Sequence, residues 1–293
     1  TNSLAIGSFI TNGQDADGIF LDDPTQAIGN QSIALGAGAV TSVDAEDGIA
    51  VGTFASTTGV GAIAIGAAGA DAEAVVCLTF DTDGVTCIEE AAGAATGAQA
   101  SGSYAVALGA DSSATGTGGL ALGNASTANG ERAVALGVSA ATAADDAFSM
   151  GTEAFAGGRR SIALGNQANT GFADSIAIGT LATATGTGTV ALGTSASATS
   201  EGAVALARGA TASEEGALAF GENATSSSIS AVAIGTSSNT SGAYSVAIGR
   251  ESFGNGAGAV SVGNRATANA ALALALGDNA NASQERGVAV VYV

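Results

Sequence analysis

Few residues in this chain could do chemistry: two cysteines, Cys77 and Cys87, and a set of scattered carboxylates. The chain has no histidine, so a serine or cysteine nucleophile would lack its usual general base. No pair of carboxylates recurs at a fixed spacing, as general acid-base catalysis would require. We therefore predict no catalytic residues and no cofactor site, and we do not expect an enzyme.

The cysteines lie in the segment VVCLTFDTDGVTCIEE, residues 75–90, which is rich in β-branched residues. This pattern predicts a β-hairpin with strands at 75–80 and 85–89. A short loop between them would set Cys77 directly opposite Cys87, and we predict a disulfide between the two. The alternative is a reduced pair in a small apolar cluster. A metal site is not expected, because no third or fourth soft ligand lies nearby.

Asp81 and Asp83 in the DTDG turn weakly resemble the start of a calcium-binding loop. The spacing that follows supplies no bidentate glutamate at the twelfth position of such a loop. A turn built from good turn formers is the favoured interpretation, so no metal site is predicted.

The element that must position these residues is a short repeat in which glycine recurs at every fourteenth position. Ala207 replaces glycine once in this series. The glycines of the series are Gly109, Gly123, Gly137, Gly151, Gly165, Gly179, Gly193, Gly221, Gly235, Gly249, Gly263 and Gly277. A short fixed period predicts a solenoid, in which each repeat forms one coil and stacks on its neighbours.

Each glycine closes a strand in which large, small and large residues alternate, as in SIALG at 161–165. The period of two places the large residues on one side of the strand and the small residues on the other. We expect the large residues to face inward across a thin core. The small residues would then form an outward column along the solenoid, with the charged residues at the corners of the coils.

An outward column of small residues would let another backbone approach closely, and exposed apolar strips mark interaction sites. We therefore predict lateral self-association through this column. The predicted interface consists of Ala135, Ala163, Ala177, Ala191, Ala205, Ala219, Ala233, Ala247 and Ala275.

The sequence predicts an all-β chain in two parts. Residues 109–293 carry the regular repeat, whereas residues 1–108 form less regular coils with a hairpin inserted at about 71–94. The step from Gly36 to Gly52 is longer than the regular repeat and indicates a two-residue corner insertion. About twenty coils spaced by about 4.8 Å would make a rod roughly 90 to 100 Å long.

The repeats GNASTANGERAVALG, GNQANTGFADSIAIG and GTLATATGTGTVALG resemble the head repeats of trimeric autotransporter adhesins, the YadA-like heads. This resemblance implies a left-handed parallel β-roll that forms a homotrimer and projects from an outer membrane to bind host or environmental surfaces. The sequence contains no neck motif, heptad stalk or membrane-anchor strands. We therefore expect either a head segment or a roll used without an anchor.

The composition limits the partners. The formal net charge of −19 argues against nucleic acid or anionic lipid, which need basic patches. No apolar run is long enough for a membrane helix, so direct membrane insertion is not expected. Thr185, Thr187 and Thr189 suggest the threonine ladder of an ice-binding solenoid, but the ladder does not recur in register and that function is not predicted.

Two functions from different classes remain open. The first is an extracellular, cell-surface adhesin head that attaches to matrix, other cells or environmental surfaces. The second is a subunit of a secreted filament that stacks end to end, because terminal strands without polar caps pair with other chains. A phage tail-fibre segment would share the same roll. The predicted axial contacts of the filament are Leu4, Ile6, Val288, Val290 and Tyr292.

Overall fold

The computed structural model describes residues 2–7, 10–14, 20–23, 25–67, 77–80, 87–90 and 97–291, which form strands and turns and no helix. The fold is a parallel β-solenoid of about 17 turns, as predicted from the repeat. The chain divides into two compact units, Thr1–Asp146 and Ala147–Val293. The predicted boundary at residue 108, where the repeat becomes regular, stays a prediction.

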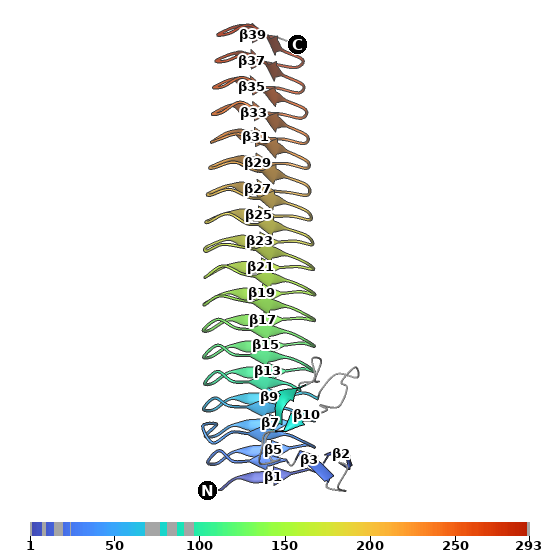
Figure 1. Ribbon diagram of the computed structural model, residues 1–293. Helices are drawn as coiled ribbons and strands as arrows, with labels where there is room; N and C mark the ends of the chain where they lie inside the picture. The colour runs from blue at the N-terminus through green and yellow to red at the C-terminus, as the bar shows by residue number, and fades with distance from the viewer. Residues whose placement is uncertain are drawn as a thin grey trace. The chain divides into compact units, whose positions relative to one another are not determined.

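In each unit, a coil contains one longer strand and one shorter strand, joined by two tight turns (Figure 1). We call them long and short strands. Long strands pair in parallel with the long strands of adjacent coils, and short strands pair in the same way. The register of β21 and β23 sets Ile162 beside Ile176 and Ala163 beside Ala177, one repeat further on.

The long strands of the N-terminal unit are β1 (Leu4–Ile6), β5 (Ile33–Leu35), β7 (Ile49–Val51), β9 (Ile63–Ile65), β13 (Val106–Leu108), β15 (Leu120–Leu122) and β17 (Val134–Leu136). Its short strands are β4 (Gln26–Ala27), β6 (Val40–Thr41), β8 (Ser56–Thr57), β12 (Gln99–Ala100), β14 (Ser113–Ala114), β16 (Thr127–Ala128) and β18 (Ala141–Thr142).

The long strands of the C-terminal unit are β19 (Phe148–Met150), β21 (Ile162–Leu164), β23 (Ile176–Ile178), β25 (Val190–Leu192), β27 (Val204–Leu206), β29 (Leu218–Phe220), β31 (Val232–Ile234), β33 (Val246–Ile248), β35 (Val260–Val262), β37 (Leu274–Leu276) and β39 (Val288–Val290). Its short strands are β20 (Phe155–Ala156), β22 (Asn169–Thr170), β24 (Thr183–Ala184), β26 (Ser197–Ala198), β28 (Thr211–Ala212), β30 (Thr225–Ser226), β32 (Asn239–Thr240), β34 (Phe253–Gly254), β36 (Thr267–Ala268) and β38 (Asn281–Ala282).

A glycine closes almost every long strand and suits the backbone geometry there; Ala207 after β27 and Val291 after β39 are the exceptions. Gly165 has a φ of +134°, and a Cβ added there would lie 2.6 Å from the carbonyl carbon of Gly179 in the next coil. Glycine adopts this φ and this close approach without strain because it has no Cβ. The turns also hold left-handed residues such as Gln167 and Asp174, at φ 55° and 59°.

The core is built from small side chains, and this corrects the predicted orientation of the strands. The middle residue of each long strand points inward: Ala163 and Ala177 are fully buried, and their large neighbours in the same strands point outward. Among the residues whose side chains are described, alanine is the only buried hydrophobic residue, and threonine is the largest fully buried side chain. The two thin layers of strands therefore lie too close together for leucine or isoleucine to fit between them.

Several of the serines and threonines in this core bond through their hydroxyls to nearby turns. Ser175 Oγ donates to the carbonyl of Phe172 at 2.6 Å, and Thr189 Oγ1 donates to the carbonyl of Gly186 at 2.7 Å. Ser126 repeats the pattern with the carbonyl of Gly123 at 2.9 Å. Each of these hydroxyls is satisfied by a carbonyl slightly earlier in the chain, so it stabilises the turn that brings the chain back.

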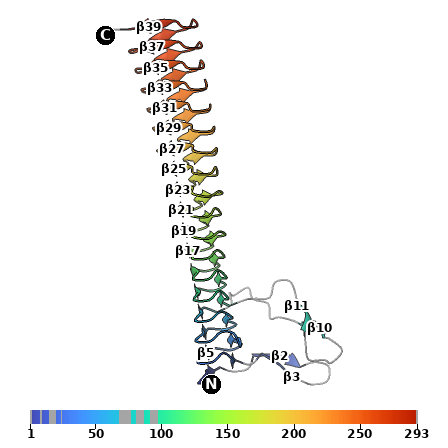
Figure 2. The ribbon, with the colours of Figure 1, turned by 90° about the vertical axis from the view of Figure 1, so that its left-hand side faces the viewer.

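Two antiparallel hairpins interrupt the N-terminal unit and pair with none of the stacked strands (Figure 2). One, β10 (Cys77–Phe80) and β11 (Cys87–Glu90), was predicted. The other, β2 (Ile10–Gln14) and β3 (Phe20–Asp23), was not.

The coils on either side of each hairpin pair directly, β1 with β5 and β9 with β13. The segments that carry the hairpins are therefore insertions and add no turn to the stack. This explains why there are fewer turns than the twenty we expected. The predicted two-residue corner insertion is confirmed, because Ile33 pairs directly with Ile49 across the longer step.

Candidate functional site

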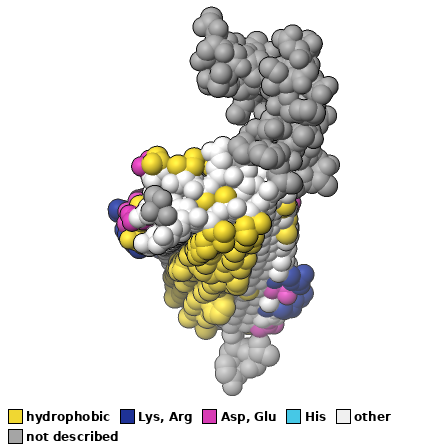
Figure 3. All heavy atoms as spheres, turned by 90° about the horizontal axis from the view of Figure 1, so that it is seen from below, with side chains coloured by type: hydrophobic (Ala, Val, Ile, Leu, Met, Phe, Trp, Pro, Cys, Tyr) yellow, Lys and Arg dark blue, Asp and Glu magenta, His cyan; other side chains and the backbone are white. Residues whose placement is uncertain are grey.

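The first surface is an apolar face formed by the first and last residues of the long strands. We call it the outer face. Both residues of each strand are at least partly exposed, and the last residue is often the more exposed: Ile178 is 40% exposed and Phe220 is 52% exposed. Figure 3 shows hydrophobic side chains gathered in a band, with charged side chains on either side of it. Exposed apolar surface of this kind is typical of a protein interface.

The alanines predicted to form an interface lie beneath this face and not on it. Ala135, Ala163, Ala177, Ala191, Ala205, Ala219, Ala233, Ala247 and Ala275 are all fully buried within their own chain. The prediction was wrong about which side of the strand faces water. Their large neighbours, which were expected in the core, form the accessible apolar surface instead.

The residues predicted to make axial contacts belong to the same outer face. Leu4 pairs with Ile33 and Ile6 with Leu35, and at the other end Val288 pairs with Leu274 and Val290 with Leu276. Their side chains are exposed, at 67% for both Val288 and Val290. They point sideways from the strands, so contacts along the axis would involve the backbone edge. Tyr292 lies outside the described residues.

The charged side chains lie at the corners of the coils, as predicted, and several pair with the next coil. Arg160 Nε lies 2.7 Å from Asp174 Oδ1, and Arg132 Nε lies 2.6 Å from Asp146 Oδ1. The hydrogen bond from Arg160 lowers the pKa of Asp174, and the hydrogen bond to Asp146 raises the pKa of Arg132. These pairs are about half exposed, so they join neighbouring coils only weakly.

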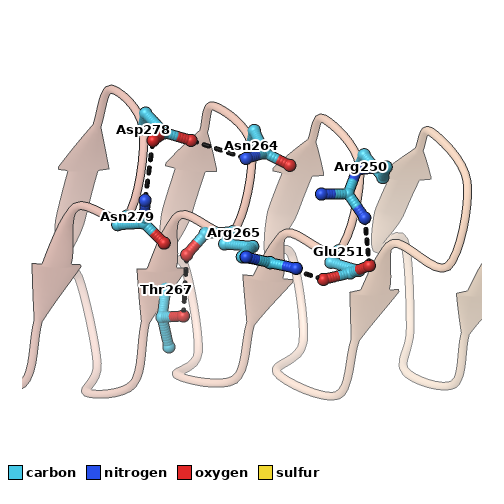
Figure 4. A network of polar contacts seen from close by, with 7 residues as sticks. All are labelled: Arg250, Glu251, Asn264, Arg265, Thr267, Asp278 and Asn279. Carbon is cyan, nitrogen blue, oxygen red and sulfur yellow. Dashed lines mark hydrogen bonds and ion pairs between the residues drawn. The ribbon is translucent and has the colours of Figure 1, made fainter. Parts of the chain in front are cut away.

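Figure 4 shows such a ladder at one corner of the C-terminal unit. Glu251 accepts from Arg265 Nε at 2.7 Å and pairs with Arg250, and the hydrogen bond from Arg265 lowers the pKa of Glu251. Two coils on, Asp278 accepts from Asn264 and Asn279 at 2.6 Å each. The contacts from Arg265 to Glu251 and from Asn264 to Asp278 join successive coils, whereas the other two join neighbouring residues within one coil. We therefore assign this corner a structural role.

The second surface is the outward side of the short strands, which carries no charge in the described coils of the C-terminal unit and is polar over most of its length. In each coil the first residue of the short strand and the residue two positions later point outward, because the residue between them is buried. We call the part of this surface on β24, β26, β28 and β30 the hydroxyl face, because serine and threonine fill both outward columns there. Its first column is Thr183, Ser197, Thr211 and Thr225; its second is Thr185, Thr199, Ser213 and Ser227.

The hairpin differs from the prediction in register. Cys87 pairs with Phe80, and Cys77 pairs with Glu90, so the two cysteines are not directly opposite each other. The irregular register in this hairpin could not be derived from residue types. The disulfide itself stays a prediction, because the side chains of both cysteines lie outside those described.

Asp81 and Asp83 also lie outside the described residues. Within the described part of the chain, no group of three or more cysteine, aspartate or glutamate side chains is placed to hold a metal ion. No helix in that part of the chain is long and apolar enough to cross a membrane.

These features define a class of protein: a parallel β-solenoid with short regular coils, a core of small residues and an apolar outer face. The YadA head domain repeat matches well over half of the chain, and the chain belongs to the YadA head family. The matched residues are 27–45, 44–68, 96–112, 114–140, 128–154, 156–182, 184–206, 212–236, 226–252 and 268–290. The chain is thus an adhesin-type head, from a family that is adhesive and structural and is displayed at the cell surface.

Among solved structures, the chain is similar to the collagen-binding domain of the Yersinia adhesin YadA. The two are 20% identical, the match covers 62% of this chain and 70% of that domain, and the TM-score is 0.26. No curated protein sequence matches the chain. The family assignment therefore rests on the repeat and its register.

Proposed function

We propose that this chain is the head of a surface-anchored adhesin that self-associates through its outer face and attaches the cell to matrix, to other cells or to environmental surfaces. The observation that carries the proposal is the exposed apolar surface of the long strands. In water such a surface is costly to leave uncovered, so burial against other copies would stabilise the head. The family resemblance supports three copies.

The mass of the purified chain in solution tests self-association. We expect light scattering to report a discrete multimer, three copies by resemblance to the family. Replacing two outer-face residues, Ile178→Asp and Phe220→Asp, would place charges in the buried contact and reduce the mass to that of one chain. The matched control, Thr180→Asp with Thr194→Asp, adds the same charge at exposed corners and should leave the multimer intact.

A stable monomer at every concentration would remove the self-association part of the proposal. A mass that grows without limit as concentration rises would favour the alternative, a filament subunit. Attachment is tested separately, by incubating the labelled multimer with cells, matrix proteins and bare surfaces. If the multimer adhered to none of these three targets, the attachment part of the proposal would be wrong.

A further inference from the structure

The hydroxyl face differs from the polar ladders at the corners of the C-terminal unit in its hydrogen bonding. The hydroxyls of Thr183, Thr185, Ser197, Ser213 and Thr225 have no hydrogen-bond partner among the described residues. In the corner ladders, polar side chains of adjacent coils satisfy one another: Gln167 donates to Glu153 at 2.6 Å, and Asn264 donates to Asp278 at 2.6 Å. Beyond the hydroxyl face, the second outward column is also paired, since Asn255 donates to Asn269 at 2.9 Å. The other three hydroxyls of the face donate to backbone carbonyls: Thr199 to Ser213, Thr211 to Gly209 and Ser227 to Thr240. Five of its eight hydroxyls are therefore free to donate and accept.

The array is regular because the backbone is. Thr183 pairs with Ser197, Ser197 with Thr211 and Thr211 with Thr225, so hydroxyls in one column repeat at the strand spacing of about 4.8 Å. A Cβ added at Gly171 would lie 3.6 Å from the side chain of Thr185, so the second column stacks in the same way. The residues between the columns, such as Ala184 and Ala198, are fully buried in the core. The hydroxyls are thus held on a fixed backbone, and binding would order little of the chain.

Charge limits what this face can bind. In the described coils of the C-terminal unit, no residue in either outward column of the short strands is charged, although the chain carries a net charge of −19. The corner beside the second column carries Glu201, Glu214 and Glu215, all exposed. These carboxylates repel anionic polymers, and the face has no basic residue to attract them. Between Phe155 and Phe253 the outward columns hold no aromatic residue, so a ligand there would be held by hydrogen bonds and not by stacking on rings.

We propose that the hydroxyl face binds an uncharged linear polysaccharide lying along the solenoid axis. Such a polymer carries hydroxyls that both donate and accept hydrogen bonds, and it repeats them at every sugar, as the face does at every coil. Each hydrogen bond contributes little alone, but several coils bind the same chain at once. The inference rests on the attachment function proposed above and gives it a ligand class and a surface.

Co-sedimentation of the full chain with insoluble polysaccharides tests this inference. The uncharged probes are cellulose, chitin and a β-1,3-glucan, and the anionic probe is cross-linked alginate. We expect the chain to sediment with at least one uncharged probe, to a similar extent at low and high salt, and not with alginate. The variant Thr183→Val/Thr211→Val/Thr225→Val keeps β-branched residues on the strands and should weaken binding roughly tenfold or more.

A second variant, Ser197→Asp/Thr211→Asp, places charge in the array and should also abolish sedimentation. Its matched control is Thr180→Asp/Thr194→Asp, at the corners of adjacent coils, which should bind as the parent does. Circular dichroism establishes that each variant is folded.

Three results would overturn the inference: no sedimentation with any uncharged polysaccharide, adsorption to ice alone, or undiminished binding by both face variants. If the chain adheres to protein-coated surfaces but to no uncharged polysaccharide, this inference fails while the attachment function stands.

Discussion

A Cβ added at Gly193 would lie 2.6 Å from the carbonyl carbon of Ala207 in the next coil. Gly165 and Gly263 approach the next coil as closely, and at Gly193 the φ of +132° adds a second constraint. We expect Gly193→Ala to destabilise the C-terminal unit by about 2 kcal/mol or more, because the backbone must shift to relieve the contact. Thermal unfolding followed by circular dichroism measures this. An unchanged melting temperature would contradict it.

Ala207 occupies a glycine position of the repeat and should be a site of backbone strain. Its φ is +104°, in a region that residues with a Cβ rarely adopt, whereas Gly193 and Gly221 lie at +132° and +141°. We expect Ala207→Gly to stabilise the chain by about 1 kcal/mol, since relief of strain exceeds the added entropy of the unfolded chain. A melting temperature lower than that of the parent would show that Ala207 is not strained.

The narrow core should reject any enlargement. Ala177 is fully buried, while Ile178 beside it in β23 is 40% exposed. Ala177→Leu is expected to cost about 3 kcal/mol or more, because the extra carbons have no space between the layers. Ile178→Leu is the control and should change the stability of a single chain by less than about 0.5 kcal/mol. If the two variants melted alike, our orientation of the strands would be wrong.

Buried hydroxyls should contribute to stability through the turns that they satisfy. Removing the hydroxyl in Thr189→Val leaves the carbonyl of Gly186 without its partner and should destabilise the unit by about 1 to 3 kcal/mol. Thr187 is exposed, so Thr187→Val is the matched control and should have little effect. Chemical denaturation of both variants decides the matter. Equal stability would mean that this hydrogen bond contributes nothing.

The ion pairs between coils should make stability depend on pH in the acid range. The hydrogen bond from Arg160 lowers the pKa of Asp174 in the folded state, so the folded chain binds this proton less readily than the unfolded chain. The contribution is therefore fully present above the unfolded pKa of about 4, and is lost as pH falls through the folded pKa.

We expect Asp174→Asn to lower the melting temperature slightly at neutral pH and to match the parent below about pH 2. High salt should reduce the difference at neutral pH. The control is Glu214→Gln, since Glu214 has no ion pair within the described chain. A difference between parent and Asp174→Asn that persisted in strong acid would assign the effect to something other than charge.

The sequence determined the solenoid, its short period and the corner position of the charges, because glycine and charge recur at fixed positions. It did not show which side of a strand such as Ile176–Ile178 faces inward, since the alternation of large and small residues assigns them to two faces without saying which face is buried. Hydrophobicity favoured burying Ile176 and Ile178, but the width of the coil admits only Ala177. The signal that could have found the outer face was the volume inside so short a coil, which has room for small side chains only.

The insertions were harder to predict than the coils. The hairpin of β10 and β11 was visible because its composition departs from the repeat, whereas β2 and β3 resemble ordinary strands in an irregular region. Register inside β10 and β11 depends on irregular pairing near Thr79, which residue types do not encode. The hydroxyl face was missed because Thr185, Thr187 and Thr189 were grouped by sequence spacing, although Thr189 points into the core.

Each coil of the C-terminal unit pairs with its neighbours through one long and one short strand, always in the same register. One coil can therefore take the place of another. Removing or duplicating one repeat leaves matched edges, an intact column of small core residues and no new unsatisfied backbone group. The gene segment behind such a repeat can therefore shorten or lengthen by unequal recombination and still encode a folded product. Lineages that carry this head can thus change its reach in steps of one coil without having to evolve a new core.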